Sequence, residues 1–476
     1  MLKIFNRAFH MTKNETTAKD IEFRQTNEIL NLVEKAKRLT PIYMGTTLNK
    51  SKFPHLKIKM TKEGEPQVVG LKNTIENLAH MLKEYGVVCR YNQMTRMREI
   101  YIPGAAFSRD NEVDRQLDSV YNLSVLNDMQ FGRDWVNGAL SSICEQDCYH
   151  PVKLWVELRP WDGFSRLRLL IETLQVSAEY AEHRDAVVRK WLVSAMAAIY
   201  STSLDDKFEG CLVLQGLQGK GKTSWFKSLV PASMRAVLEG HTLDPNNKDS
   251  VFTLAGHWIA ELGELDTTFS KAEIGKLKGF LSNTVDKLRR PYAKGDSEMK
   301  RQTVIGASVN RPDFLIDDTG NRRWWTVPVM GVNFMHGIDM QQLWTEVKLL
   351  VDAGAVWHLS ANEMAVLNNV NEGFTAVTPL AELIPTAFDF EKKVISLVGL
   401  AGVELTDTVR MTATQVVELF GMPRDRKTVA EAGATLRKLT GEAPKKSNGL
   451  MVWTLQLRKH SEMKSSIPGM CFRKVA

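Results

Sequence analysis

The chain has 476 residues, of which 43% are hydrophobic and 25% charged, with a formal net charge of +7. This length predicts about three domains of ordinary globular composition, and no run approaches the roughly 18 apolar residues of a membrane-spanning helix. Five cysteines, an odd number, favour a reducing compartment over a disulfide framework. We therefore expect a cytoplasmic protein with no membrane partner, and a charge that permits a nucleic-acid partner without requiring one.

The first 200 residues divide into two predicted parts. Residues 1–65 are polar and rich in lysine, with one helical pattern at 21–39, and favour a basic, flexible segment. The alternative is that the lysines at 50, 52, 57 and 59 contact phosphate. Residues 66–200 predict a mostly helical domain, with helical patterns at 73–84, 129–143 and 167–200 and a short strand at 99–103. His150 and Trp161 lie in corners between helices, where we expect them to pack rather than to catalyse.

The segment 216–223, GLQGKGKT, fits the phosphate-binding pattern G-x-x-x-x-G-K-[ST] without a gap. An apolar run at 211–214 predicts a buried strand before it, and 224–229 is compatible with a helix after it. Glycines let backbone N–H groups surround a phosphate chain, Lys222 would neutralise the β- and γ-phosphates of ATP, and the Thr223 hydroxyl would ligate Mg²⁺. A chance glycine-rich turn is the alternative. The expected nucleotide contacts are Gly216, Gln218, Gly219, Lys220, Gly221, Lys222, Thr223 and Ser224.

Two further predicted strands end in polar side chains. The strand at 257–260 runs into Glu261, assigned to the metal, and Glu264, assigned to activation of the attacking water. The alternative is that Glu264 or Asp266 is a surface acid. The strand at 303–308 is followed by Asn310, whose side chain can hydrogen-bond the γ-phosphate and the attacking water.

A pair of arginines, Arg322 and Arg323, stands at the entry to an apolar strand at 324–329. Such a pair can stabilise transition-state charge in the site of a neighbouring subunit. The alternative is a structural salt bridge to Asp317 or Asp318. We expect at least one of the two arginines to be catalytic.

The short spacing between Lys222, Glu261 and Asn310 predicts a compact core without the inserted lid of a small-metabolite kinase. The stretch between them instead interleaves basic residues with an aromatic one, which suits a surface that follows a nucleic-acid strand. A solvated helix face is the alternative. The DNA contacts expected here are Tyr292, Lys294 and Lys300.

Several segments carry a family resemblance together and in order. They are YHPV (149–152), WDG (161–163), GLQGKGKT (216–223), WIAELGEL (258–265), DKLRRPYAKG (286–295), VIGASVN (304–310), DDTGNRRWW (317–325) and QLWTEV (342–347). Over about residues 70–370 the chain resembles the virulence-associated protein E family of phage and mobile-element proteins, which is related to superfamily 3 helicases within the AAA+ ATPases.

The resemblance implies an α/β ATPase core, ring assembly, a role in replicating phage or island DNA, and a hairpin in the channel near 292–300. Its functional positions correspond to Lys222, Thr223, Glu261, Asn310, and Arg322 or Arg323. Related helicases often have adjacent acids at the second strand, whereas Glu261 and Glu264 are separated, so the main catalytic acid stays open. No primase signature is visible upstream, and a primase is expected only as a separate replication partner.

The C-terminal region follows an expected linker at 380–391. Helical patterns at 390–400, 414–420 and 428–439, with a hairpin turn at 447–449, predict a winged-helix domain. Basic side chains on its third helix and wing suit contacts with the phosphates of duplex DNA. A winged helix that binds protein is the alternative. The residues expected to contact DNA are Arg424, Arg426, Lys427, Lys445 and Lys446.

The sequence therefore predicts an α/β fold with a P-loop AAA+ type ATPase core at 201–375, after the 1–65 segment and the 66–200 domain, and a winged-helix domain at 376–476. The expected function is an ATP- and Mg²⁺-dependent DNA helicase of phage or mobile-element replication, acting as a homo-hexameric ring on single-stranded DNA in the bacterial cytoplasm. The alternatives are a replication initiator or helicase loader that does not unwind DNA, and a small-molecule phosphotransferase.

Overall fold

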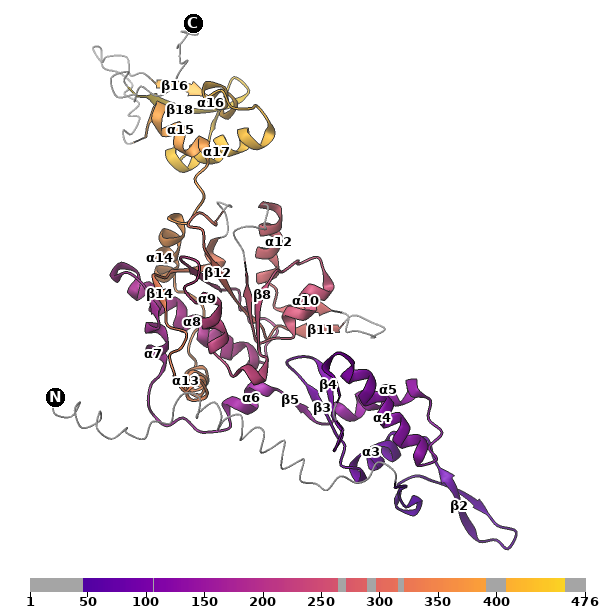
Figure 1. The fold of residues 1–476 in the computed structure, drawn as a ribbon. Helices are drawn as coiled ribbons and strands as arrows, with labels where there is room; N and C mark the ends of the chain where they lie inside the picture. The colour runs from indigo at the N-terminus through magenta and orange to yellow at the C-terminus, as the bar shows by residue number, and fades with distance from the viewer. Residues whose placement is uncertain are drawn as a thin grey trace, which may run out of the picture. The chain divides into compact units, whose positions relative to one another are not determined.

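The computed structural model describes residues 46–105, 107–263, 271–288, 297–315, 321–390 and 408–458. The chain divides into two compact units, residues 1–374 and 375–476 (Figure 1). Among these residues, no helix combines the length and hydrophobicity that a membrane span requires.

The first unit begins with a small α/β body that has its own hydrophobic core, built on residues such as Leu78, Val120 and Leu140. Strands β1 and β2 form an antiparallel ribbon, and a separate sheet has the order β4-β3-β5. The elements are η1 (Lys50–Lys52), β1 (Leu56–Met60), β2 (Pro66–Leu71), α3 (Ile75–Glu84), β3 (Val88–Asn92), β4 (Met97–Tyr101), η2 (Arg109–Asn111), α4 (Glu112–Leu126), α5 (Arg133–Cys144) and β5 (Cys148–Tyr149).

Residues 50–60 differ from the flexible segment that we predicted. The Asn49 side chain accepts a hydrogen bond from the Ser51 N–H and caps η1, and the Leu48 N–H donates to Asn127 Oδ1 at 2.8 Å. Strand β1 then pairs with β2 along its whole length. The pairing partner lies beyond the lysine-rich stretch, so local composition did not reveal it. The helix expected at 21–39 lies outside the described residues.

A run of helices leads from this body to the central sheet. It comprises α6 (Pro151–Val156), α7 (Leu167–Glu172), β6 (Leu174–Gln175), η3 (Ala178–Tyr180) and α8 (Ala181–Tyr200). We predicted one continuous helical pattern over 167–200. The structure instead has two α-helices, α7 and α8, separated by β6, which pairs with β14. His150 is buried and caps α6, and burial lowers the pKa of His150 to about 3, which is consistent with the expected packing role.

The central sheet is wholly parallel, with the order β13-β7-β12-β9-β8. Its elements and those that follow are β7 (Cys211–Gln215), α9 (Lys222–Ser228), η4 (Ala232–Met234), β8 (Val237–His241), α10 (Lys248–Ala255), β9 (Ile259–Leu262), α12 (Lys271–Leu281), β10 (Val285–Leu288), β11 (Ser297–Lys300), β12 (Val304–Val309), η5 (Asn321–Arg323), β13 (Trp324–Pro328), β14 (Gly331–Val332), α13 (Met340–Asp352) and α14 (Ala361–Glu372).

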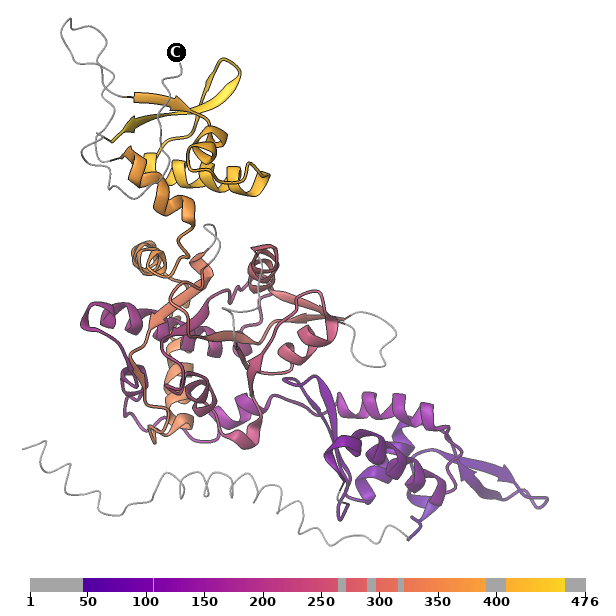
Figure 2. The same cartoon turned by 45° about the horizontal axis from the view of Figure 1, so that its top comes forward.

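Helices cover both faces of this sheet, as its unbroken apolar strands require. Successive side chains of β7 point to opposite faces: Leu212 and Leu214 join the core beneath α8, α9 and α13, and Val213 joins the core beneath α10 and α12 (Figures 1 and 2). Helix α8 is locked to the sheet, since Trp191 Nε1 donates to the Ile305 carbonyl at 2.9 Å. The domain boundary that we predicted at residue 200 remains a prediction. Helix α8, which lies before that boundary in the chain, packs against the central sheet.

The second unit contains α15 (Pro379–Ala387), β15 (Phe388–Asp389), β16 (Thr408–Met411), α16 (Ala413–Leu419), α17 (Arg426–Thr440), β17 (Lys445–Ser447) and β18 (Leu450–Leu457). Strand β18 is central, flanked by β15 and β16 and also paired with β17. The predicted hairpin is confirmed: Asn448 and Gly449 have φ of 46° and 81°, the positive values that a tight turn between two strands needs.

Helix α15 lies where we predicted a linker, and that prediction is wrong for residues 379–387. The Thr378 side chain caps the helix, and Pro379 stands at its first turn, where proline is tolerated, while Pro385 lies inside the helix. The helix also buries Leu380 and Ile384 in the core of the unit. Most of the helix expected at 390–400 lies outside the described residues.

A buried ion pair fixes the base of the β10–β11 hairpin. Arg301 Nε donates to Asp286 Oδ1 at 3.2 Å, Arg301 Nη1 donates to the Phe280 carbonyl at 2.5 Å, and the guanidinium stands 4.0 Å from the centre of the Phe280 ring. Both charged side chains are at most 2% exposed. Removal of one charge would leave the other without its partner in the interior.

We expect Asp286→Ala to lower the free energy of unfolding by about 3–5 kcal/mol, because the Arg301 charge would stay buried and unpaired. Urea denaturation followed by tryptophan fluorescence measures the change. Asp313→Ala is the matched control, since Asp313 pairs with Arg311 on the surface and its loss should change stability little. Equal stability of the two variants would contradict the structural role of the buried pair.

Candidate nucleotide-binding site

The predicted phosphate loop lies at the carboxyl end of the parallel strands, the edge where open α/β sheets bind ligands. It leaves β7 at Gly216, whose N–H donates to the Val309 carbonyl at 3.1 Å, and enters α9 at Lys222. Gly219 and Gly221 have φ of 78° and 83°, a backbone region that favours glycine. A Cβ atom on Gly221 would lie 2.4 Å from the Phe334 ring. The loop therefore keeps this shape only with glycine at 221.

The Lys222 ammonium group joins the loop to the neighbouring strand. Its Nζ donates to the Gly216 carbonyl at 2.6 Å, to the Leu217 carbonyl at 2.8 Å and to Asn310 Oδ1 at 3.0 Å, and the residue is 5% exposed. Two residues that we predicted to share a phosphate are thus in direct contact. A phosphate entering the loop would meet a cation already in place.

Glu261 projects from the end of β9 beside the first turn of α9. Its Oε1 accepts from Thr223 Oγ1 at 3.1 Å and its Oε2 accepts from the Gly240 N–H at 2.7 Å, while the residue is 0% exposed. The structure brings together the two residues expected to hold the metal. Carboxylate and hydroxyl oxygens are the donors that Mg²⁺ prefers, so these side chains fit the ion.

Ser308 is a member of this group that the sequence did not reveal. Its Oγ lies 3.3 Å from Thr223 Oγ1 and comes from β12, two residues before Asn310. The sequence predicts this serine only as the last residue of the strand at 303–308. Its position in a strand whose end already carries a predicted site residue was the available signal, because alternate residues of a strand share a face.

Three of the expected site residues lie outside the described residues, and one, Lys300, has a buried amine. Glu264, Tyr292 and Lys294 lie outside the described residues. The Nζ of Lys300 is buried, and burial lowers the pKa of Lys300. A buried amine is poorly placed to contact DNA. The contact that we predicted for Lys300 stays a prediction. Among the remaining loop residues, Gln218, Gly219 and Lys220 are exposed and Ser224 is half-buried.

The predicted basic contacts of the second unit are on its surface. Arg426 and Lys427 open α17, and Lys445 and Lys446 form most of β17, all exposed. Arg424 is also exposed, and its Nε lies 3.1 Å from Glu418 Oε1. The unit thus presents cations from a helix start and from a hairpin strand.

Arg322 and Arg323 lie at the opposite edge of the sheet from the phosphate loop. They form the end of η5 just before β13, whose first residue Trp324 pairs with Cys211 at the start of β7. A strand of five residues is about 16 Å long, so the arginines stand roughly that far from the loop of their own chain. Arg322 is 57% exposed, whereas Arg323 is 17% exposed.

The acidic partner of both arginines is Glu209. Arg323 Nε lies 3.5 Å from Glu209 Oε2 and donates to Ser282 Oγ at 2.7 Å, and Arg322 Nη2 lies 3.9 Å from Glu209 Oε1. We had named Asp317 and Asp318 as alternative partners, and these lie outside the described residues. The longer, more exposed contact leaves Arg322 freer than Arg323 to meet another molecule.

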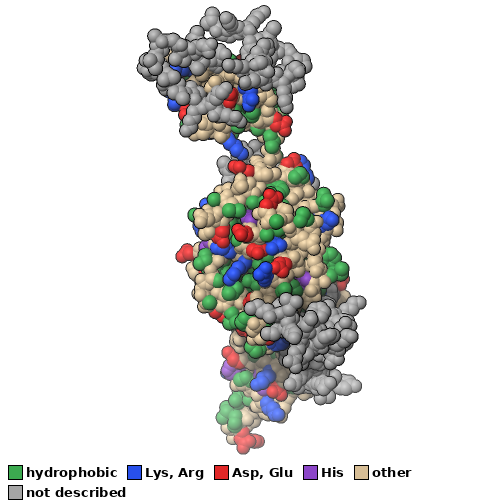
Figure 3. All heavy atoms as spheres, turned by 90° about the vertical axis from the view of Figure 1, so that its left-hand side faces the viewer, with side chains coloured by type: hydrophobic (Ala, Val, Ile, Leu, Met, Phe, Trp, Pro, Cys, Tyr) green, Lys and Arg blue, Asp and Glu red, His purple; other side chains and the backbone are tan. Residues whose placement is uncertain are grey.

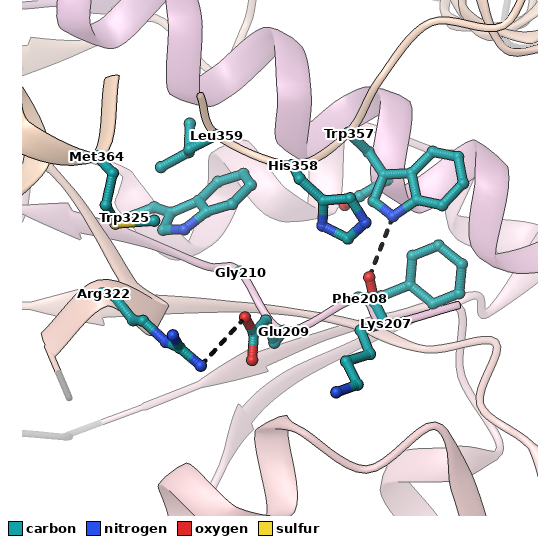
Figure 4. A pocket seen from close by; sticks show the side chains of 11 residues that line it. Lys207, Phe208, Glu209, Gly210, Arg322, Trp325, Trp357, His358, Leu359 and Met364 are labelled. Carbon is teal, nitrogen blue, oxygen red and sulfur yellow. Dashed lines mark hydrogen bonds and ion pairs between the residues drawn. The ribbon is translucent and has the colours of Figure 1, made fainter. Parts of the chain in front are cut away.

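A cavity of about 250 Å³ adjoins the arginine edge (Figure 4). Its aromatic wall includes Phe208, Trp325 and Trp357, and Trp357 Nε1 donates to the Lys207 carbonyl at 3.1 Å. Arg322 and Glu209 border it, so it belongs to the arginine edge and not to the phosphate loop.

Figure 3 shows a face on which basic and acidic side chains alternate, without one dominant sign.

Comparison with known proteins gives one family match. Residues 156–376 match the family model described as "Virulence-associated protein E-like domain". This confirms the predicted resemblance for the residues that carry the phosphate loop, Glu261, Asn310 and the arginine pair. No curated protein sequence matches the chain.

Among solved structures, the NrS-1 C-terminal region aligns with 80% of this chain and 99% of its own, at 13% identity and a TM-score of 0.42. The JCV helicase aligns with 64% of this chain and 99% of its own, at 9% identity and a TM-score of 0.26. Likenesses this weak do not establish a shared fold.

We expect Glu261→Gln to lower the turnover of ATP by at least about 100-fold while changing nucleotide affinity little, because a carboxylate that positions metal or water acts mainly in the transition state. The glutamine keeps the shape of the side chain and an oxygen for the Gly240 N–H. Steady-state hydrolysis and a nucleotide titration measure the two quantities.

The matched control is Glu239→Gln, an exposed carboxylate on β8 that pairs with Lys227. It should hydrolyse ATP at the parent rate. Glu264→Gln should also lower turnover more than affinity. Parent rates in both Glu261→Gln and Glu264→Gln would contradict the assignment of the catalytic acid to this strand end.

Proposed function

We propose that this chain, whose residues 156–376 form a virulence-associated protein E-like domain, is an ATP-dependent DNA helicase of phage or mobile-element replication. The observation that supports the proposal is the cluster at the carboxyl edge of the sheet. There Lys222 contacts Asn310, and Thr223 contacts the buried Glu261. A loop cation, a hydroxyl, a carboxylate and a polar strand end are the parts that phosphoryl transfer to water requires.

Each residue has a separate role in the proposed reaction. Lys222 and the N–H groups at the start of α9 bind the β- and γ-phosphates of ATP. Thr223 and Glu261 hold Mg²⁺, which when bound neutralises charge on these phosphates. The Asn310 amide, next to Lys222, orients the γ-phosphate and the attacking water.

Ring assembly is the second part of the proposal. The loop and the arginine pair lie at opposite ends of the strands of one sheet, which favours an arginine that reaches the γ-phosphate of a neighbouring chain over one that reaches its own. Neighbouring copies arranged head to tail would place Arg322 of one copy at the loop of the next. A heterologous contact of this kind forms a ring when the rotation between copies closes, and we propose a closed ring of six subunits around single-stranded DNA.

The second unit is proposed to be a winged-helix domain that binds duplex DNA. Helices α16 and α17 and the β17–β18 hairpin supply the elements of such a domain, and the exposed lysines of β17 would contact phosphates. The same basic surface would equally serve an initiator or helicase loader. A strand-displacement assay with Mg²⁺ and ATP separates these functions, since only a helicase unwinds DNA.

Lys222→Ala tests the proposed site. We expect no measurable ATP hydrolysis from a folded protein, because the positive charge that meets the transferred phosphate is removed. Lys227→Ala is the control, since Lys227 lies on the same helix and is half-exposed beside Glu239. Unchanged turnover in a folded Lys222→Ala protein would refute the nucleotide site.

The trans arrangement predicts that two inactive proteins complement one another. Mixing Lys222→Ala subunits with Arg322→Ala/Arg323→Ala subunits should restore ATP hydrolysis, because some interfaces then pair an intact loop with an intact arginine. An arginine of this kind is worth roughly 10³–10⁵ in rate. Turnover per subunit of the parent protein should also rise with concentration as rings form.

Two results would place the arginines in cis or in a purely structural role. One is a mixture that stays inactive although mixed oligomers are shown by native mass spectrometry. The other is a dilute monomer that hydrolyses ATP at the full rate.

A further inference from the structure

The β1–β2 ribbon extends from the first α/β body with both of its faces in solvent. Residues 57–60 and 62–69 are all exposed. Figures 1 and 2 show the ribbon extending away from helices α3, α4 and α5 of that body. An isolated two-stranded ribbon is at best marginally stable in water, so this one needs support at its ends.

The buried side chain of Asn77, on α3, supports the base of the ribbon. Its Oδ1 accepts from the His55 N–H at 3.0 Å, and its Nδ2 donates to the carbonyls of His55 and Lys72, each at 2.8 Å. The Lys72 N–H also donates to the His55 carbonyl at 3.0 Å. Both strands are therefore joined to one side chain in the interior of the body.

Thr61 closes the other end of the ribbon. Its N–H donates to the Glu65 carbonyl at 2.8 Å, and its Oγ1 accepts from the Glu65 N–H at 3.1 Å. Gly64 has a φ of 82°, which this tight turn requires. With its base and its turn both held by hydrogen bonds, the ribbon is an ordered arm.

One face of the ribbon is apolar. Ile58 is paired with Val68 across the two strands, and Met60 is paired with Pro66. Side chains of such pairs, two residues apart along each strand, lie on the same face. Ile58, Met60 and Val68 are 56%, 66% and 41% exposed. A group of exposed apolar side chains of this kind indicates a binding surface.

The opposite face is basic. Lys57 and Lys59 alternate with the apolar residues of β1, and both are exposed. Neither lysine has an ion-pair partner among the residues that the structure describes. The strands β1 and β2 contain no acidic residue, since Glu63 and Glu65 lie in the turn. The strands therefore carry only positive charge, which is complementary to a polyanion.

We infer that this ribbon is an arm that binds the major groove of duplex DNA. That groove is about 12 Å wide and admits a two-stranded ribbon. Ile58 and Val68 face the base edges, where thymine methyl groups offer apolar contacts. Lys57 and Lys59, on long side chains, contact the phosphates that border the groove. A protein partner could cover the apolar face, but it would not account for strands whose charges are all positive.

The inference rests on the proposed function for the identity of the partner, DNA. It adds a contact surface that neither the phosphate loop nor the second unit supplies. Its test uses the full chain without nucleotide, so that it does not depend on the ATP site. Binding to a short labelled duplex is measured by fluorescence anisotropy over a range of salt concentrations.

The variant Lys57→Ala/Lys59→Ala tests the basic face. The slope of log K against log salt concentration should become shallower by about 2, because two phosphates lose their cations. Lys83→Ala/Arg115→Ala is the matched control, since it removes two exposed charges from helices α3 and α4 of the same body. This control should keep the slope of the parent protein.

The variant Ile58→Ala/Val68→Ala tests the apolar face. It should bind the duplex about tenfold more weakly with an unchanged salt slope, because apolar contacts are lost and no charge is. A duplex with deoxyuridine in place of thymidine lacks the methyl groups in the major groove. The parent protein should bind this duplex more weakly than the thymidine duplex, and the difference should shrink in the variant.

An unchanged salt slope in the lysine variant would overturn the inference, as would equal binding of the two duplexes by the parent protein. If Ile58→Ala/Val68→Ala alters the oligomer in sedimentation velocity but not the affinity for DNA, the apolar face is an interface between copies and the inference is wrong. All four substituted ribbon positions are exposed, so the variants are expected to fold, and thermal melting checks this. Absence of strand displacement by the parent protein, with these binding differences intact, would refute the helicase and support the arm.

Discussion

The buried ammonium group of Lys222 is the interaction on which the candidate site depends. A cation in the interior is costly unless oxygens surround it, and here two come from the loop itself and one from Asn310 on β12. The loop must therefore curl back over its own lysine, which requires the left-handed glycine at 221. The order of the strands must also place β12 directly beside β7. Local backbone shape and sheet topology meet in this one side chain.

The two ends of the parallel strands in this sheet carry chemically different side chains. Parallel strands all present their carboxyl ends on one side, where the loop, Glu261 and Asn310 gather. Their amino ends lie on the other, where Glu209 holds the arginine pair. No antiparallel strand in the described sheet mixes the two. A sheet built in this way is polar along its strands, and copies that meet edge to edge bring unlike groups together.

Much of the site could be predicted because its parts are local patterns. The loop motif and the polar ends of apolar strands depend on backbone rules that act over a few residues, as does the Asn448–Gly449 turn of the second unit. Ser308 and Glu209 were missed because their importance comes from partners far away in the chain, Thr223 and the arginines. Sequence position alone does not distinguish them from other strand and loop residues.

The same reason accounts for the errors in the fold. Strand β1 needs β2 to exist, β6 needs β14, and α15 is stabilised by burial against α17 and β18 despite Pro385. In each case a tertiary partner overrode a local preference. Elements whose apolar residues follow one clear period, such as β7 and α17, were predicted within a few residues.

Gly306, in the middle of β12, has a mechanical consequence. A Cβ atom there would lie 2.3 Å from the Phe226 ring, so the bare backbone lets the ring of α9 rest directly on the strand. Trp225, the preceding residue, donates from Nε1 to Thr173 Oγ1 at 2.8 Å, and its ring contacts the Phe226 ring. Helix α9 is therefore held by two contacts, one to β12 and one to Thr173, and cannot slide without breaking one of them. The start of α9, which carries Lys222 and Thr223, therefore has a fixed position relative to the strands of the sheet.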